Sequence, residues 1–146
     1  MSKFLLQVSN LKMTYAHKNG AINLFNDVNI NIKSGELIAL VGPSGSGKST
    51  FLHLLALLDD PTKGQIILNN KDTKNLSDKD KDQVRMDKIS IIFQDNNLLA
   101  DFTALENVMM PLIIKGKKKK ETIIKAKKIL NSVKISNRLN HFPNEL

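Results

Sequence analysis

The sequence predicts an α/β fold, because strand and helix patterns alternate along its 146 residues without an internal repeat. The clearest strand pattern is the continuous apolar run 36–41, which a glycine ends. Such a run is typical of a strand buried on both faces of a mostly parallel sheet. The stretch 51–58 that follows is apolar around its whole circumference, so we expect a buried helix there.

Shorter segments complete the predicted sheet. Alternating or continuous apolar patterns predict strands over 4–8, 28–32, 64–68 and 89–93. The third of these ends at Asn69 and Asn70, and asparagine tolerates positive φ. We therefore expect a tight turn at this pair.

Two helices are predicted in the last third of the chain. Thr103 and Glu106 have the spacing of a capping box, and Leu105, Val108 or Met109, and Leu112 then fall on one helix face. Pro111 is expected to kink or stop this helix. The next helix carries an apolar stripe made of Ile123, Ala126, Leu130 and Val133, and its opposite face is rich in lysine.

The net charge of +8 arises in one segment, 115–134, which holds nine lysines against the single acidic residue Glu121. A solvated helix face is the preferred interpretation of these lysines, with an acidic membrane surface or protein partner as the alternative. Specific nucleic-acid binding is not expected, because the segment lacks arginine and aromatic side chains.

Composition excludes several classes of site. The chain has no cysteine, so it has no disulfide framework, thiol nucleophile or cysteine zinc site. Its three histidines, His17, His53 and His141, are scattered, so any metal should be held by oxygen. No apolar run approaches the ~20 residues that span a bilayer, and residues 1–4 lead into strand-like sequence, so we expect a cytoplasmic protein.

The strongest chemical signal is a complete G-x-x-x-x-G-K-[ST] pattern between the predicted buried strand and its helix, the context in which a P-loop binds phosphates. The candidate nucleotide-binding residues are Gly42, Pro43, Ser44, Gly45, Ser46, Gly47, Lys48, Ser49 and Thr50. Glycines allow successive N–H groups to face one concavity, and the helix N-terminus adds partial positive charge. Lys48 would reach the β- and γ-phosphates of ATP, and the Ser49 hydroxyl would bind Mg²⁺.

With these residues the sequence resembles the nucleotide-binding subunit of ATP-binding cassette (ABC) transporters. The resemblance implies that Tyr15, in Leu11-Lys-Met-Thr-Tyr15, stacks on adenine, although position alone would make it a strand-end or packing aromatic. It also implies that Gln94, in Ile91-Ile-Phe-Gln94, contacts Mg²⁺ or the attacking water. On the sequence alone Gln94 is equally a strand-end hydrogen-bonding residue.

Within this family the chain resembles most the LolD group, the ATPases of the lipoprotein-releasing system, together with the related MacB and FtsE group. Residues 54–64 and 97–112 carry this resemblance. It implies a P-loop NTPase fold of the ABC type, N-terminal part only, with a nucleotide-binding core over 1–95 and the start of a helical subdomain over 96–146. The implied partners are a second ATPase subunit and membrane-spanning subunits of the FtsX-like type, at the cytoplasmic face of the inner membrane.

In this family the segment that corresponds to residues 142–146 immediately precedes the signature motif. The resemblance therefore implies that the signature loop, the Walker B aspartate, the catalytic glutamate and the switch histidine are not among these 146 residues. We expect the chain alone to bind Mg-ATP at most, without turnover, and to have open sheet edges that aggregate or associate. The alternative functions are a MacB-like exporter, an FtsE-like ATPase, or a non-functional nucleotide-binding fragment of a degraded gene.

Overall fold

The computed structural model describes residues 4–18, 20–95 and 97–146, which form two compact units that divide between Ser90 and Ile91. The first unit contains four strands and two helices, and the second unit is helical. The α/β prediction is therefore confirmed.

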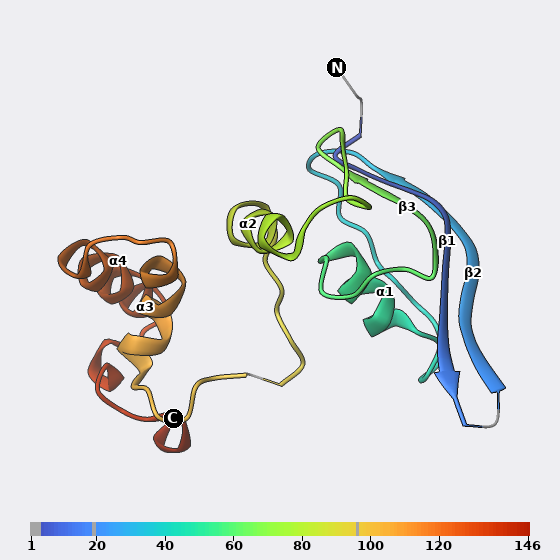
Figure 1. Ribbon diagram of the computed structural model, residues 1–146. Helices are drawn as coiled ribbons and strands as arrows, with labels where there is room; N and C mark the ends of the chain where they lie inside the picture. Colours follow the sequence, from blue (N-terminus) through green and yellow to red (C-terminus); the bar gives the residue numbers. More distant parts are fainter. Residues whose placement is uncertain (1–3, 19, 96) are drawn as a thin grey trace. The chain divides into compact units, whose positions relative to one another are not determined.

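The first unit is built on a four-stranded antiparallel sheet with the order β2-β1-β3-β4 (Figure 1). Its strands are β1 (Leu6–His17), β2 (Gly20–Ile32), β3 (Lys63–Leu68) and β4 (Lys71–Asp72). β1 pairs with both β2 and β3, so it is the central strand of the long part of the sheet. It runs well beyond the short strand predicted at 4–8.

The turn between β3 and β4 is formed as predicted, because Asn69 and Asn70 adopt φ values of 50° and 64°. Along 28–32 of β2 the side chains alternate between half-buried and exposed, which confirms the half-buried strand predicted there. At the start of β3, Gly64 has a φ of +96° and lies directly against the backbone of Asn10 and Leu11 in β1. Glycine is required at this position by the close approach of the two strands.

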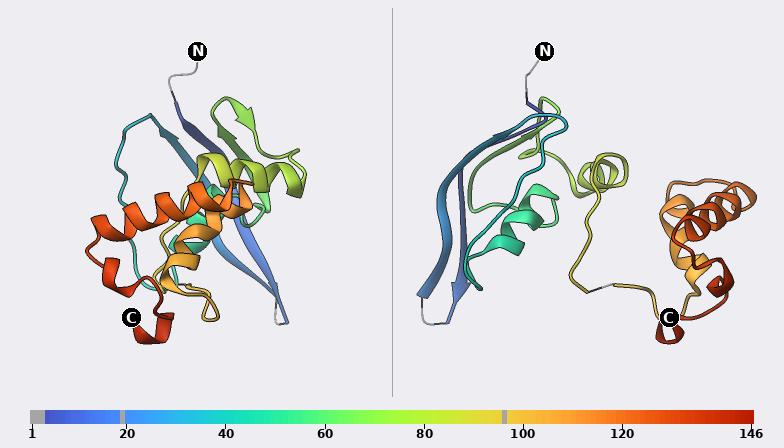
Figure 2. Two further views of the ribbon diagram at one scale, coloured as in Figure 1. Left: turned by 90° about the vertical axis from the view of Figure 1, so that its left-hand side faces the viewer. Right: turned by 180° about the vertical axis from the view of Figure 1, so that it is seen from behind.

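Helix α1 (Lys48–Leu55) covers one face of this curved sheet (Figures 1 and 2). Its Phe51 and Leu54 are buried in a core cluster with Val8 and Leu11 of β1. The rings of Phe25 in β2 and Phe51 meet edge to face with their centroids 5.8 Å apart. These contacts join the helix to both long strands.

The prediction of a helix buried all round over 51–58 is wrong in two respects. The helix ends at Leu55, and Leu52 on its outer face is 54% exposed. A single sheet face can bury only one side of a helix, so the apolar side chains on the other side of α1 stay exposed among the described residues.

The predicted strands at 36–41 and 89–93 are also corrected. Within the described residues neither segment joins a sheet, and the side chains of Leu37 and Ile92 are each 99% exposed. A continuous apolar run shows only that the side chains of a segment favour burial. A strand forms only where a neighbouring strand supplies the ladder of hydrogen bonds. Among the described residues no such neighbour lies beside either segment.

Helix α2 (Asp78–Lys88) was not predicted, because it has no apolar stripe. Its start is marked by Ser77, whose hydroxyl accepts a hydrogen bond from the Asp80 amide at 3.2 Å. The helix is attached to the loop after α1 through an ion pair between Lys81 and Asp60 at 2.7 Å. Arg85 also donates a hydrogen bond to the Leu57 carbonyl oxygen.

The second unit consists of α3 (Ala104–Ile114) and α4 (Lys119–Ser132), followed by the short 3₁₀ turns η1 (Ser136–Arg138) and η2 (Pro143–Glu145). α3 and α4 pack against each other (Figure 2). No helix within the described ranges is both long and apolar enough to cross a membrane.

The predicted capping box at the start of α3 is confirmed. The Thr103 hydroxyl accepts from the Glu106 amide at 3.3 Å, and the Thr103 amide donates to a Glu106 carboxylate oxygen at 2.9 Å. Pro111 does not stop the helix, because α3 continues past it to Ile114, and a kink at Pro111 stays a prediction.

In α4 the predicted apolar stripe is correct for Ala126 and Leu130, which are buried, and wrong for Val133, which is 58% exposed. The buried face also includes Thr122, near the start of the helix, whose hydroxyl donates to the Lys118 carbonyl at 3.0 Å. This local bond satisfies the hydroxyl, so threonine can be buried there without an unpaired polar group.

The close contact between Gly64 and β1 predicts that a side chain at position 64 destabilises the sheet. An alanine Cβ there would lie 2.5 Å from the Asn10 carbonyl oxygen and 2.6 Å from the Leu11 Cα. We expect Gly64→Ala to lower the free energy of unfolding by about 3 kcal/mol, because backbone on both strands must move. Urea unfolding followed by circular dichroism measures this loss.

The matched control is Gly35→Ala, where φ is +81° and no atom lies within 4 Å of the added Cβ. This variant carries only the cost of a left-handed backbone, roughly 1–2 kcal/mol. Equal losses in the two variants would contradict the steric account of Gly64.

The capping box leads to a test of pH dependence. The backbone N–H and then the hydroxyl of Thr103 hold the pKa of Glu106 below its ordinary value. The folded state therefore prefers the carboxylate, and this contribution to stability is present above pH 4.5 and is lost as the pH falls through the lowered pKa. Carboxyl NMR titration should show a raised Glu106 pKa in Thr103→Ala and no change in Ser132→Ala, whose hydroxyl bonds only to the Ile129 carbonyl.

Candidate functional site

The predicted P-loop, residues 42–50, leads directly into α1 in the first unit. Gly45 and Gly47 adopt φ values of +78° and +86°, which L side chains rarely adopt. The Ser46 amide donates to the Pro43 carbonyl at 3.3 Å, and the Phe51 amide donates to the Gly47 carbonyl at 2.8 Å. The loop therefore turns sharply before Gly47, the residue that caps the helix.

Gly47 also connects the loop with the sheet. A Cβ at this position would lie 3.2 Å from the Phe25 ring and 3.4 Å from the Leu24 Cβ. The start of α1 consequently rests against β2, and the same Phe25 ring contacts Phe51 one turn further along the helix.

Lys48 folds back over the loop. Its Nζ donates to the carbonyl oxygens of Gly42 at 2.9 Å and Pro43 at 2.7 Å. Both partners are neutral, and Lys48 has no carboxylate partner within the described ranges. The ammonium group thus sits at the loop with its charge uncompensated.

The first turn of α1 provides further hydrogen-bond donors. Across the described part of the chain, no protein acceptor is found for the amide N–H groups of Lys48, Ser49 and Thr50. Gly47 offers no side-chain cap, and the turn contains no acidic residue. Free N–H groups at the positive end of a helix, next to a lysine, are the chemistry that binds an anion such as a phosphate.

A magnesium ion would need more than these residues. Ser49 is exposed at the start of α1 and could contribute its hydroxyl. In residues 4–18, 20–95 and 97–146 there is no cluster of three acidic or histidine side chains that could hold a metal. Mg²⁺ commonly binds through one or two protein groups together with phosphate oxygens, and Ser49 fits such a partial site.

Tyr15 and Gln94 are not joined to the P-loop by a described interaction. Tyr15 lies in β1, where it pairs with Ile22 of β2, and its ring is partly exposed. Gln94 belongs to the second unit and is exposed in a segment without helix or strand. Their roles in binding adenine and Mg²⁺ stay predictions.

Two pockets of the first unit adjoin α1. One of about 280 Å³ adjoins the P-loop, and its apolar wall is formed by Phe25, Val28, Leu40, Val41 and Phe51. The apolar wall supplies no hydrogen-bond donors, and the rest of the pocket is lined by P-loop residues, among them Gly42, Gly47 and Lys48.

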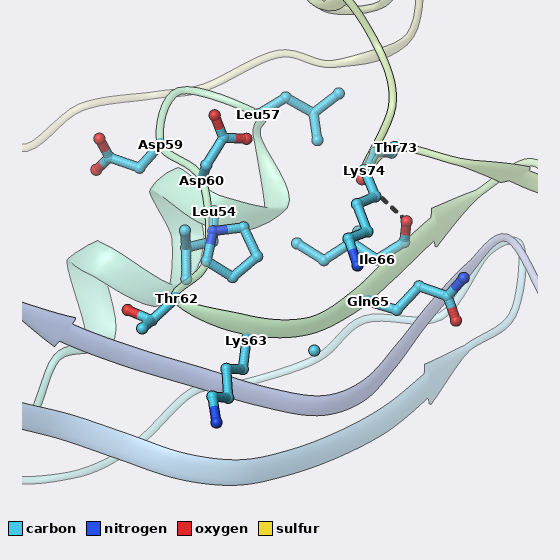
Figure 3. A pocket seen from close by; sticks show the side chains of 12 residues that line it. Leu54, Leu57, Asp59, Asp60, Thr62, Lys63, Gln65, Ile66, Thr73 and Lys74 are labelled. Atoms are coloured by element: carbon cyan, nitrogen blue, oxygen red, sulfur yellow. Dashed lines mark hydrogen bonds between the residues drawn. The ribbon is translucent and has the colours of Figure 1, made fainter.

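The other pocket, of about 380 Å³, lies beyond the C-terminal end of α1 (Figure 3). Asp59 and Asp60 line it from the loop after the helix, and Lys63 and Gln65 line it from β3. Asp60 is already paired with Lys81. The sequence did not predict this pocket, and it includes no residue of the P-loop.

Comparison with known proteins gives a consistent result. The model of the ABC transporter family matches residues 25–146. The chain is 43% identical over its full length to the lipoprotein-releasing system ATP-binding protein LolD of Rickettsia bellii and 42% identical to that of Colwellia psychrerythraea. It spans 64% and 56% of the lengths of these two relatives.

Solved structures agree with this match. A dimeric ATP-binding cassette, MJ0796, in a post-hydrolysis state bound to ADP and Pi, superimposes with a TM-score of 0.89 at 39% sequence identity. A second dimeric structure of MJ0796, described as a bacterial ABC transporter cassette, gives the same values. The match covers 97% of this chain and 62% of that one.

Proposed function

This chain belongs to the ABC transporter family, and from that premise we propose that its P-loop, residues 42–50, binds the phosphates of ATP within an ATP-binding subunit of the lipoprotein-releasing type. The observation that carries the proposal is the start of α1, where three amide N–H groups without a protein acceptor adjoin the ammonium group of Lys48. Members of this family use nucleotide and Mg²⁺.

Binding would replace the present partners of Lys48. Its Nζ donates to two neutral carbonyl oxygens, whereas a phosphate oxygen carries the opposite charge and adds Coulombic attraction to the hydrogen bond. An incoming phosphate would therefore displace the lysine from Gly42 and Pro43. Ser49 and the phosphate oxygens would then share the Mg²⁺ ion, with Gln94 as a further ligand or as a contact to water.

The described residues support binding more than turnover. Phosphoryl transfer requires a carboxylate to position the metal and a group to orient the attacking water, besides the phosphate cradle. The P-loop supplies the cradle and one charge. We therefore assign nucleotide binding to these residues and leave hydrolysis to the complete ABC ATPase.

The proposed partners are a second ATP-binding subunit and a membrane permease of the FtsX-like type. The dimeric state of MJ0796 supports the first, and a membrane partner agrees with the ABC transporter family and with the lipoprotein-releasing system in the relatives' names. Co-purification of the membrane subunit tests this assignment, because a MacB-like exporter or an FtsE-like ATPase would bring a different membrane protein. A chain that binds neither nucleotide nor a membrane subunit would be a non-functional fragment.

Removing the ammonium group should weaken nucleotide binding. We expect Lys48→Ala to lower the affinity for Mg-ATP by roughly 10- to 100-fold, because a hydrogen bond to a charged group contributes about 1.5–3 kcal/mol. Titration calorimetry on the full chain measures this change. Lys63→Ala removes a lysine from the same unit without touching the P-loop, and equal affinities in the two variants would contradict the role of Lys48.

Tyr15 can be tested by comparing two ligands. If its ring stacks on adenine, Tyr15→Ala should weaken the binding of ATP by about 1–3 kcal/mol and leave the binding of inorganic triphosphate unchanged. Ile22→Ala is the matched control, since Ile22 is the exposed ladder partner of Tyr15. If Tyr15 only packs against the sheet, Tyr15→Ala should weaken the binding of both ligands to the same extent.

A further inference from the structure

The lysine excess of the chain gathers in and around α4 of the second unit. Segment 115–134 holds nine lysines and one glutamate. Its lysines are exposed, in the helix, in the connection from α3 that precedes it, and at Lys134 just after it. The charge is therefore presented to solvent and is not used in packing within this unit.

One face of α4 combines this charge with an apolar side chain. Ile124 is 70% exposed, on the side of the helix opposite the buried Ala126 and Leu130. Lys120, Lys127 and Lys128 stand at the i−4, i+3 and i+4 positions around it. We call these four residues, Lys120, Ile124, Lys127 and Lys128, the lysine surface.

The lysine surface has little internal compensation. Glu121 pairs with Lys125 at 2.6 Å, but Lys120, Lys127 and Lys128 form no ion pair within the part of the chain that the structure describes. Lys119 and Lys120 share the first turn of α4 with Glu121, next to Lys118 at the N-cap, whose side chain makes no capping bond. Cations at the positive end of a helix are unfavourable, so an external anion would relieve a real repulsion.

We propose that the lysine surface binds the anionic headgroups of a phospholipid membrane, with Ile124 entering the boundary between headgroups and acyl chains. Clustered lysines around an apolar residue on one helix face are the pattern of an interfacial helix. Charge complementarity favours an acidic surface over a second copy of this cationic helix. Base recognition is not favoured, because the segment has neither arginine nor an aromatic side chain.

This surface lies wholly in the second unit, so the proposal is independent of nucleotide binding at residues 42–50 in the first unit. Loss of one activity would leave the other intact. An ATP titration on each variant below separates the two.

Vesicle flotation with the full chain tests the proposal, because aggregated protein sediments while vesicle-bound protein floats. Vesicles of phosphatidylcholine with about one third phosphatidylglycerol should carry the chain at low salt, and pure phosphatidylcholine vesicles should not. Replacing Lys120, Lys127 and Lys128 with glutamine should reduce partitioning by roughly 100-fold, since each lysine near an anionic surface contributes about fivefold.

The matched control replaces Lys71, Lys79 and Lys88, three exposed lysines of the first unit, with glutamine. This triple variant has the same net charge and should keep most of the binding. Ile124→Ser should remove the binding that persists at high salt, whereas Ile22→Ser should retain it. Circular dichroism checks that each variant remains folded.

Equal losses in the two lysine triple variants would overturn the proposal, because net charge and not the lysine surface would then account for binding. Binding to duplex DNA as tight as to phosphatidylglycerol vesicles, with the same dependence on Lys120, Lys127 and Lys128, would also overturn it in favour of a general polyanion surface. Binding to an acidic peptide in place of vesicles would point to a protein partner and would equally contradict it.

Discussion

The packing of α1 onto β1 determines where the candidate site can form. Phe51 and Leu54 bury one side of this short helix against Val8 and Leu11. The helix begins at Lys48, so the same contacts that hold Leu54 also fix the direction in which the first-turn N–H groups point. At the loop itself, a side chain added at Gly47 would press on the Phe25 ring of β2, so glycine allows the loop to lie against the sheet. The phosphate site therefore depends on the antiparallel sheet beneath it.

Among the described residues, the P-loop and α4 both carry lysines without an ion-pair partner, and the two arrangements differ. At the P-loop, a few hydrogen-bond donors lie together, and Lys48 donates to the Gly42 and Pro43 carbonyl oxygens. On α4 the charge is spread over flexible exposed side chains around Ile124. The first arrangement suits one compact anion, and the second suits an extended anionic surface whose attraction is screened by salt.

The sequence predicted those features that short stretches determine by themselves. Three features depend only on residues close together in the sequence: the P-loop, the turn at Asn69–Asn70 and the capping box of Thr103. The structure has the Asn69–Asn70 turn and the capping box where they were expected. The family was also predicted from local motifs and is shown by the matches. The roles of Tyr15 and Gln94 involve distant groups, and they stay predictions.

Features that depend on distant neighbours were predicted poorly. The run 36–41 has the composition of a buried strand, yet no described strand pairs with it and Leu37 is exposed. α2 escaped prediction because contacts with Asp60 and Leu57, and not an apolar stripe, hold it in place. The pocket beside Asp59 is formed by segments that are separate in sequence, so no short sequence motif predicts it.

A crystal structure of this chain with Mg²⁺ and a non-hydrolysable ATP analogue tests the central claim most directly. The account predicts that the Lys48 Nζ leaves the Gly42 and Pro43 carbonyls and lies about 2.7–3.2 Å from a phosphate oxygen. The amide N–H groups of Lys48, Ser49 and Thr50 should face the same phosphates. A bound nucleotide whose phosphates lie elsewhere, with Lys48 still on both carbonyls, would contradict the account.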